Sequence, residues 1–257
     1  MLAVGTLWQR EVVRFLRQRS RVIGALAQPI VFWLLLGGGL SASFRPPGAP
    51  ASTGYLEYFF PGTIALVLLF TAIFATIAVV EDRRSGFLQG VLVAPVSRRT
   101  IVLGQALGGT TLAVVQGGLF LALAPLAGVP LTGARVVASI GTMAVVAFGL
   151  TNLGLLIAWR MESTQGFHAI MNLVLLPIWF LSGAFFPATD APTLLGWLMR
   201  LDPLTYGLGA LRACLYLGRD VAFADVPALA PSLAVSALFG VITLVAATMV
   251  AERSSTL

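Results

Sequence analysis

The sequence predicts an all-α protein that crosses a membrane several times, and three observations support that prediction. Only 10% of the 257 residues are charged, and 58% are hydrophobic. Soluble domains carry about 25% charged residues, so this deficit is typical of membrane proteins. The mean hydropathy is high, at +0.94. The apolar residues also gather into long runs, each near the roughly 20 residues that a helix needs to span the hydrocarbon core.

Six apolar segments qualify as membrane spans, and they predict a six-helix polytopic protein in a single domain over residues 1–257. Pro29, Pro125 and Pro177 fall inside these segments. Membrane helices tolerate them because neighbouring helices can satisfy the freed backbone groups. The spans are expected at about residues 22–41, 58–80, 101–128, 135–158, 165–186 and 228–250.

The arginines predict the orientation, since cytoplasmic loops of membrane proteins carry an excess of Lys and Arg. The chain has no Lys, so all 16 basic residues are Arg. With the N-terminus inside, eleven arginines fall on the cytoplasmic side and five outside, which favours both termini in the cytoplasm. The inner set is Arg10, Arg14, Arg17, Arg19, Arg21, Arg83, Arg84, Arg98, Arg99, Arg160 and Arg253, and the outer set is Arg45, Arg135, Arg200, Arg212 and Arg219.

Two segments outside the spans have patterns of their own. Residues 1–21 place apolar side chains on one helical face and arginines on another, which predicts an amphipathic helix in the inner interface whose arginines meet anionic headgroups. A basic flank that only fixes topology is the alternative, but it does not account for the apolar face. Residues 187–227 are apolar but broken by Pro192 and Pro203. Because an Arg at mid-membrane costs about 2.5–3.5 kcal/mol, we expect short helices that re-enter the outer leaflet rather than a seventh span through Arg212.

Several kinds of chemistry are missing from the sequence. A P-loop needs a Lys after its glycines, so a chain without Lys has no P-loop ATPase of its own. All ten acidic residues fall at span ends or in loops, which argues against ion-coupled transport. His168 stands alone, and we interpret it as a packed or interfacial side chain; neither a metal site nor catalytic residues are predicted. Cys214 is the single cysteine and permits no internal disulfide. The net charge is +6, but the arginines flank apolar runs rather than forming one basic patch, so nucleic acid is not an expected partner.

Two long motifs resemble the permease subunits of the ABC-2 family. The family's loop after the second span is similar to residues 81–105, EDRRSGFLQGVLVAPVSRRTIVLGQ. Its fifth span and the segment beyond are similar to residues 171–212, MNLVLLPIWFLSGAFFPATDAPTLLGWLMRLDPLTYGLGALR. The two motifs cover about a quarter of the chain, in the family's order. Gln89 and Asp202 stand where the family often has Glu and Asn, which puts specific ion pairs at those two positions in doubt.

The resemblance implies a half-transporter. Two permease chains, expected to be a homodimer, would bind two copies of a separate ATP-binding cassette ATPase from the cytoplasm. ATP and Mg²⁺ would belong to that ATPase, and this chain would hold no cofactor. Residues 81–100 would form the cytoplasmic coupling segment. Its charged residues would offer ion pairs, and its glycine would permit a turn. Its apolar residues would insert into a groove on the ATPase. The residues with these roles are Glu81, Asp82, Arg83, Arg84, Gly86, Phe87, Leu88 and Val91.

The family's cargo path lies between the two permeases and is lined by spans one, two and five. An uncharged polar side chain in a span often only hydrogen-bonds between helices, at about 0.6–2 kcal/mol each, and an aromatic side chain often only packs. Such structural roles remain alternatives for every candidate on the path. The candidates are Gln28, Phe32, Thr71, Asn172 and Phe180.

The composition, the arginine distribution and the family resemblance together predict the membrane subunit of an ATP-driven exporter. This subunit is expected in a prokaryotic plasma membrane, with membrane lipids around it. The cargo is expected to be a hydrophobic drug, a lipid or a lipid-linked glycan. One alternative is a carrier or channel that does not use ATP, which would need charge or a polar pore lining inside the membrane. Another is a membrane scaffold that anchors an ATPase in an envelope complex and moves nothing.

Overall fold

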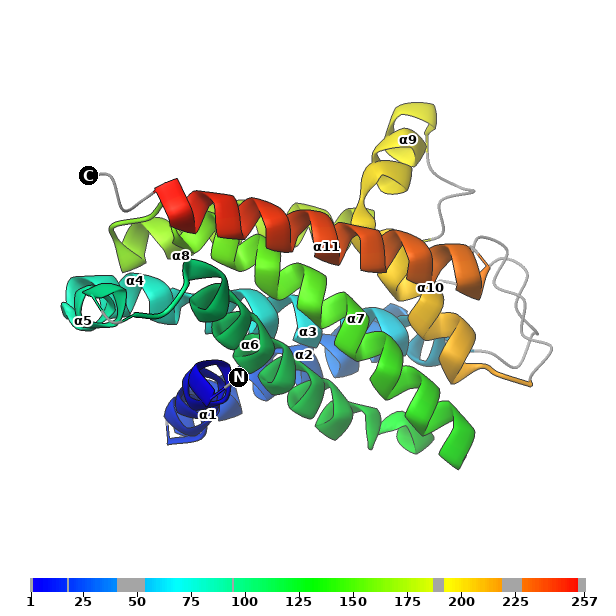
Figure 1. Cartoon of the computed structure of the whole chain (residues 1–257). Helices are drawn as coiled ribbons and strands as arrows, with labels where there is room; N and C mark the ends of the chain where they lie inside the picture. The colour runs from blue at the N-terminus through cyan, green and yellow to red at the C-terminus, as the bar shows by residue number, and fades with distance from the viewer. Residues whose placement is uncertain are drawn as a thin grey trace.

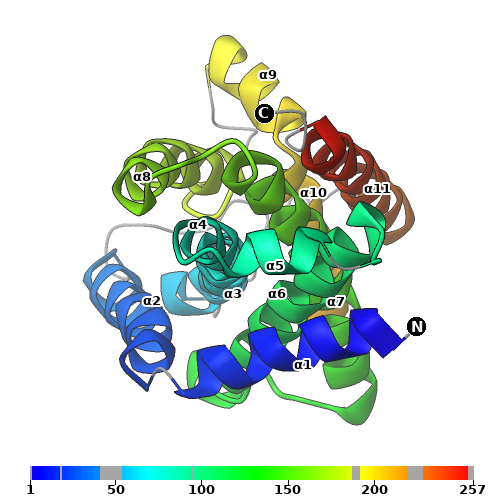
Figure 2. The same ribbon diagram turned by 60° about the vertical axis from the view of Figure 1, so that its left-hand side comes forward.

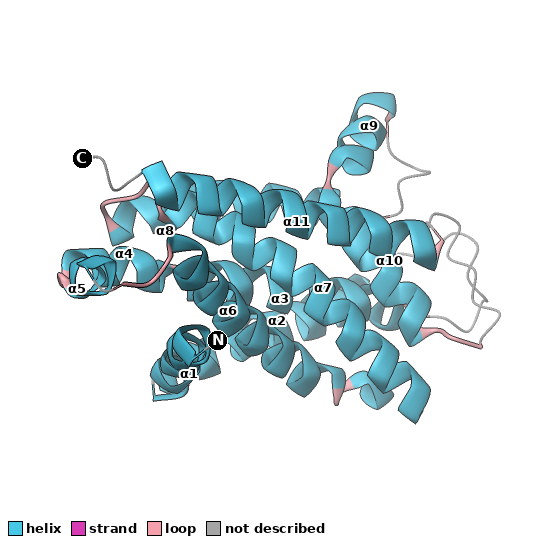
Figure 3. Cartoon of the chain, viewed as in Figure 1, coloured by secondary structure: helices cyan, strands magenta, loops and turns pink. Residues whose placement is uncertain are grey.

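Helices make up all of the regular structure in the part of the chain that the computed structural model describes, namely residues 2–17, 19–40, 54–93, 95–186, 192–218 and 228–253 (Figures 1 and 3). The all-α prediction is therefore confirmed. The elements are α1 (Leu2–Arg17), α2 (Arg19–Leu40), α3 (Tyr55–Ala75), α4 (Ile77–Arg84), α5 (Phe87–Val93), α6 (Arg98–Leu121), the 3₁₀ turn η1 (Ala124–Ala127), α7 (Gly133–Ala158), α8 (Thr164–Leu181), α9 (Thr193–Leu201), α10 (Pro203–Leu215) and α11 (Leu229–Arg253).

Five helical stretches among the described residues are long and apolar enough to cross a membrane: α3 together with α4, then α6, α7, α8 and α11. They correspond to five of the six predicted spans, and the polytopic, multi-pass architecture is confirmed. The other predicted span, 22–41, falls on α2. This helix has 22 residues, but its apolar stretch, Leu26–Gly39, is shorter than a full span. The span at 22–41 therefore stays a prediction.

Two predicted spans end earlier in the structure than the hydropathy suggests. In the span predicted at 101–128, the α-helix α6 ends at Leu121. Pro125 in η1 cannot continue an α-helix, and Gly128 adopts a φ of 86°. The span predicted at 165–186 ends with α8, and the chain then turns at Gly183, whose φ is 82°. Apolar composition continues through both turns, which explains why it overestimates the helix lengths.

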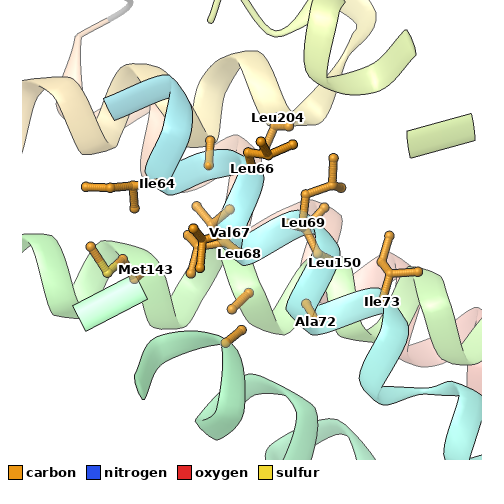
Figure 4. Packing of buried hydrophobic residues seen from close by; sticks show 14 of the residues in the cluster. Ile64, Leu66, Val67, Leu68, Leu69, Ala72, Ile73, Met143, Leu150 and Leu204 are labelled. Atoms are coloured by element: carbon orange, nitrogen blue, oxygen red, sulfur yellow. The ribbon is translucent and has the colours of Figure 1, made fainter. Parts of the chain in front are cut away.

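Helix α3 lies at the centre of the bundle. Its apolar side chains point in every direction, and 83% of the most apolar window of the α3–α4 stretch is buried. A helix that is apolar on all sides lies in a protein core or in lipid, and for α3 the surroundings are largely other helices. Accordingly, α3 packs against α2, α6, α7 and α10. Figure 4 shows side chains of α3 next to Met143 and Leu150 of α7 and Leu204 of α10.

Helix α1 lies outside the bundle and crosses α6 (Figure 2). The two helices approach closely at Gly108 of α6, where an added Cβ would lie 2.7 Å from the Cβ of Glu11. The indole Nε1 of Trp8 donates a hydrogen bond to Thr111 Oγ1 at 2.9 Å. This helix covers most of the predicted amphipathic segment 1–21, and its apolar face packs partly on protein; its place in the membrane interface stays a prediction.

Two short helices, α9 and α10, occupy the described part of residues 187–227, while residues 187–191 and 219–227 lie outside the described residues. Helix α9 projects from the side of the bundle, and α10 packs against α7 and α11 (Figure 1). Asp202 separates the two helices and caps α10, since its Oδ1 accepts a hydrogen bond from the Leu204 N–H at 2.9 Å.

The arginine that argued against a seventh span is buried in α10. Arg212 Nη2 donates to Gly183 O at 3.0 Å, and its guanidinium lies 4.5 Å from the centre of the Tyr58 ring. Helix α10 has 13 residues, too few to span a membrane. The expectation of short helices here is therefore correct, and their re-entry into the outer leaflet stays a prediction.

The long helix formed by α3 and α4 is interrupted at Thr76. Its Oγ1 donates to Ile73 O at 2.7 Å, a bond to the preceding turn that bends helices. Gly154 of α7 packs directly against this break, where an added Cβ would lie 2.8 Å from Thr76 Oγ1 and 3.1 Å from Ile73 Cα. The interruption of the helix therefore coincides with a close contact between α7 and the α3–α4 junction.

We expect Gly154→Ala to lower the free energy of unfolding. Overpacking a close contact costs about 1–3 kcal/mol, more than the roughly 0.5–1 kcal/mol gained when Ala replaces Gly in a helix. Denaturant titration of the purified protein in detergent measures the change. The matched control is Gly141→Ala in the same helix, where an added Cβ meets nothing within 4 Å. Equal destabilisation by both substitutions would contradict the close contact at Thr76.

Candidate functional site

The predicted coupling segment lies at one end of the bundle, where α4 leads into α5 (Figures 1 and 2). The amide N–H of Ser85 donates to Glu81 O at 3.0 Å and closes α4. The chain then turns at Gly86, whose φ of 76° lies in the left-handed region that disfavours residues with a Cβ. The backbone at Gly86 thus has the geometry that its predicted role requires.

The two carboxylates of the segment are engaged by α1 of the same chain. Asp82 is only 3% exposed, and its two oxygens accept hydrogen bonds from both terminal nitrogens of Arg10, each at 2.7 Å. Arg14 donates to Asp82 Oδ1 at 2.8 Å and also pairs with Glu81. The sequence predicted ion pairs offered to a partner protein, whereas the structure forms these pairs within the chain. Arg10 and Arg14 are one helical turn apart in the sequence, which predicts a shared face but not its partner.

The electrostatics of this cluster favour the charged form of Arg10 beside Asp82. The hydrogen bonds with Asp82 raise the pKa of the Arg10 guanidinium above its usual value. Glu11, on the side of α1 that meets α6, is nearly buried; burial raises the pKa of its carboxyl, and neighbouring Arg10 partly opposes that shift. Asp82 is therefore held between two cations, and α1 is held against α4 by charge-assisted, partly bidentate bonds.

The two arginines of the segment bind the other side of the bundle. Arg83 donates to Trp159 O at 2.8 Å and to Met161 O at 2.9 Å, both in the turn that joins α7 to α8. Arg84 is exposed and makes a longer contact of 3.4 Å with Thr164 Oγ1. The four consecutive charged residues that begin at position 81 thus connect α4 to α1 in one direction and to α7 and α8 in the other.

Helix α5 divides the apolar residues of the predicted coupling segment into a buried and an exposed side. Leu88 is 3% exposed and belongs to the core of this chain, and Val91 is half-buried. Phe87 is exposed, with the Arg10 guanidinium 3.8 Å from its ring centre. Val93, which was not among the predicted residues, is 88% exposed. Phe87 and Val93 are the first and last residues of α5, and the apolar composition of this short helix is the signal that could have identified Val93.

A groove of about 430 Å³ opens between α2, α3 and α8 and reaches α1 and α4. Three of the five predicted path residues line it: Gln28, Thr71 and Asn172. The other two are not part of this lining: the Phe32 ring lies edge-on to Trp179, and Phe180 stacks on Phe185. Thr71 Oγ1 also donates to Gln116 Oε1 at 2.5 Å, so this hydroxyl has the interhelical role that the sequence left as an alternative. The full lining is Phe15, Gly24, Gln28, Pro29, Leu66, Phe70, Thr71, Phe74, Ile77, His168 and Asn172.

His168 belongs to this groove, although the sequence suggested only a packed or interfacial side chain. Its ring lies 5.3 Å from that of Phe74, and it lines the groove one helical turn before Asn172. The spacing of four residues between these two positions of α8 places them on one face, and this signal was available in the sequence. Among the described residues, no three His, Cys, Asp or Glu side chains are placed to hold a metal ion.

Comparison with known proteins gives the family. The family profile described as ABC-2 type transporter matches residues 3–216. The transport permease ycf38 of Cyanophora paradoxa is 27% identical over 210 residues, covering 80% of this chain and 71% of the relative. Nodulation protein J of Rhizobium leguminosarum bv. trifolii is 25% identical over 217 residues, or 84% and 81% of the two chains. Nodulation protein J of Bradyrhizobium diazoefficiens is 26% identical over 229 residues, or 87% and 85%.

This match extends over most of the chain and includes both motifs, the coupling segment and the groove. The family implies association with an ATP-binding cassette subunit, and the sequence has no P-loop ATPase motif of its own. The chain therefore belongs to the ABC-2 type transporter family, as a multi-pass membrane permease.

Proposed function

We propose that this chain is the permease subunit of an ATP-driven exporter in a prokaryotic plasma membrane, with both termini in the cytoplasm. Two copies of a separate ATPase bind ATP and Mg²⁺ and dock on the coupling segment, and a second copy of this chain completes the membrane unit. Family membership, the absence of Lys and the eleven-to-five distribution of arginines support this proposal.

The exposed face of α5 is the observation that carries the proposal. Phe87 and Val93 are apolar and exposed, yet they lie at the arginine-rich end of the bundle rather than along its apolar sides. Exposed apolar groups surrounded by polar residues are typical of protein-binding surfaces. An apolar groove on the ATPase subunit is the complement that we propose for this face.

The ion pairs around Asp82 suggest how force passes from that contact into the membrane. Because α1 is bonded to α4 through Arg10 and Arg14, a movement of α5 moves α1 and the end of α3–α4 as one unit. ATP binding brings the two ATPase subunits together, and the permease follows if its inward and outward states contact them differently.

The groove between α2, α3 and α8 is the proposed cargo path. Aromatic rings of Phe70 and Phe74 border it, and its polar groups are amides, a hydroxyl and an imidazole rather than carboxylates or guanidiniums. This lining suits an amphiphile with an apolar body and an uncharged polar group, within the expected range of drugs, lipids and lipid-linked glycans. The outer surfaces of α2 and α8 are apolar and exposed at Leu35 and Leu173, and we propose that a second copy of this chain covers them.

Val93→Asp is expected to weaken binding of the ATPase subunit by about tenfold or more, because a charge on the apolar face of α5 would be desolvated in the complex. Titration of the purified ATPase against the permease in nanodiscs measures the affinity. Leu126→Asp is the matched control, since Leu126 is similarly exposed but lies in η1 at the other end of α6. Unchanged affinity for Val93→Asp would remove the support that α5 gives to the proposal.

Asp82→Asn is expected to loosen α1. Loss of the charge weakens hydrogen bonds from two arginines, and hydrogen bonds to charged groups contribute about 1.5–3 kcal/mol. Amide hydrogen exchange over residues 2–17 should become faster. Glu81→Gln serves as comparison, because the Glu81 side chain is 28% exposed against 5% for Asp82, and exposed pairs contribute less than about 1 kcal/mol. Equal protection of α1 in the wild type and in Asp82→Asn would disprove the clamp.

Asn172→Leu is expected to change which amphiphiles stimulate ATP hydrolysis by the complex, while basal hydrolysis stays the same. Loss of one hydrogen bond to an uncharged group, about 0.5–1.5 kcal/mol, corresponds to a roughly 2- to 12-fold weaker response to cargo with such a group. A panel of lipids and amphiphiles with and without uncharged polar groups tests this. Leu238→Ala on the exposed face of α11, away from the groove, is the control. An unaltered response profile in Asn172→Leu would place the cargo path elsewhere.

A further inference from the structure

Arg83 makes the most specific contact between the coupling segment and the rest of the bundle. Its two terminal nitrogens donate to two separate backbone carbonyls, Met161 O at 2.9 Å and Trp159 O at 2.8 Å. The guanidinium also lies 5.9 Å from the centre of the Trp159 ring. Two bonds from one planar group fix both its distance and its orientation, which a single flexible contact does not.

The carbonyls that Arg83 binds lie at the C-terminal end of α7. Trp159 is the C-terminal cap of this helix, and the last carbonyls of a helix lack partners within it. The helix dipole also makes this end partly negative. A cation at this place therefore satisfies unpaired acceptors and the dipole together, which explains why an arginine rather than an uncharged donor suits position 83.

The same turn leads directly into α8. Ser163 caps α8, with its Oγ accepting from the Gly166 N–H at 3.4 Å, so the short connection from Met161 is ordered by hydrogen bonds at both ends. Only 22% of the most apolar window of α8 is buried, against 56% for α7. The helix beyond the turn therefore has less of its surface packed on this chain than α7 has, and it carries His168 and Asn172 into the groove.

We propose that Arg83 transmits the movement of the coupling segment to α8, through the turn between α7 and α8, and so changes the groove. Arg83 is then a positioning residue that acts inside the permease, and it does not bind the ATPase. This inference rests on the proposed function, because it needs an ATPase that moves α5. Arg84, its exposed neighbour with one long contact, carries no such role.

Hydrogen exchange of the complete complex in nanodiscs, with and without a non-hydrolysable ATP analogue, tests the proposal without a known cargo. In the wild type, nucleotide should change exchange both in residues 87–93 and in residues 164–172. In Arg83→Ala the nucleotide-dependent change at 87–93 should remain, while that at 164–172 falls by about fivefold or more. Arg83→Lys should be intermediate, because one ammonium replaces a fork that reaches two carbonyls. Arg84→Ala should behave as the wild type.

A purely structural role would make 164–172 exchange faster with and without nucleotide but would keep the nucleotide-dependent difference, and that result overturns the proposal. Loss of ATPase co-purification in Arg83→Ala also overturns it, since Arg83 would then act at the docking surface. If Arg83→Ala does not fold, Arg83→Lys, which keeps the cation at the end of α7, takes its place, and an unchanged nucleotide-dependent difference at 164–172 in that variant overturns the proposal. Absence of any nucleotide effect in the wild type at 87–93 would reject the proposed function itself, together with this inference.

Discussion

Asp82 is a nearly buried carboxylate at the end of a long apolar helix, and a buried carboxylate needs an opposite charge and hydrogen bonds to offset its desolvation. Arg10 and Arg14 supply the pairing, and in doing so they bring α1 from the start of the chain onto the end of α4. Helix α1 also packs across α6 through Trp8 and lines the groove through Phe15. Interactions between side chains 72 and 68 residues apart therefore join the first helix to the charged end of the bundle.

The two ends of α4 are held in different ways. Its beginning follows an interruption at Thr76, where the side chain bonds back to the preceding turn and Gly154 allows α7 to lie close. Its far end is bonded to α1 and to the carbonyls after α7. Under the proposed function, a displacement of α5 would pass through α4 to both sets of contacts. The largely buried α3 lies at the other end of this segment.

Much of the candidate site could be predicted from the sequence, but not how its residues are partnered. Gln28, Thr71 and Asn172 lie on three helices that meet at one groove, while the assignment of that groove to the cargo path stays a proposal. Phe32 and Phe180 pack on other aromatics, and Leu88 is a core residue, because side-chain burial depends on neighbours that a linear pattern does not contain. His168 was missed although helical spacing places it on the same face as Asn172, and Val93 was missed although it is an apolar residue of the same short helix as Phe87. Each of them lacked, in the sequence, a second feature that distinguished function from packing.

The sequence by itself determined the class of the protein. Composition and the length of apolar runs decide that the chain forms membrane helices, since in lipid only helices and closed barrels satisfy every backbone group. The family motifs are local and need no structure to be recognised. Only the tertiary structure decided that Glu81 and Asp82 bind α1, that Arg83 binds the carbonyls after α7, and that α6 and α8 end at their glycine-containing turns. These features depend on which distant groups become neighbours and on single backbone torsions, and neither is encoded in a periodic or compositional signal.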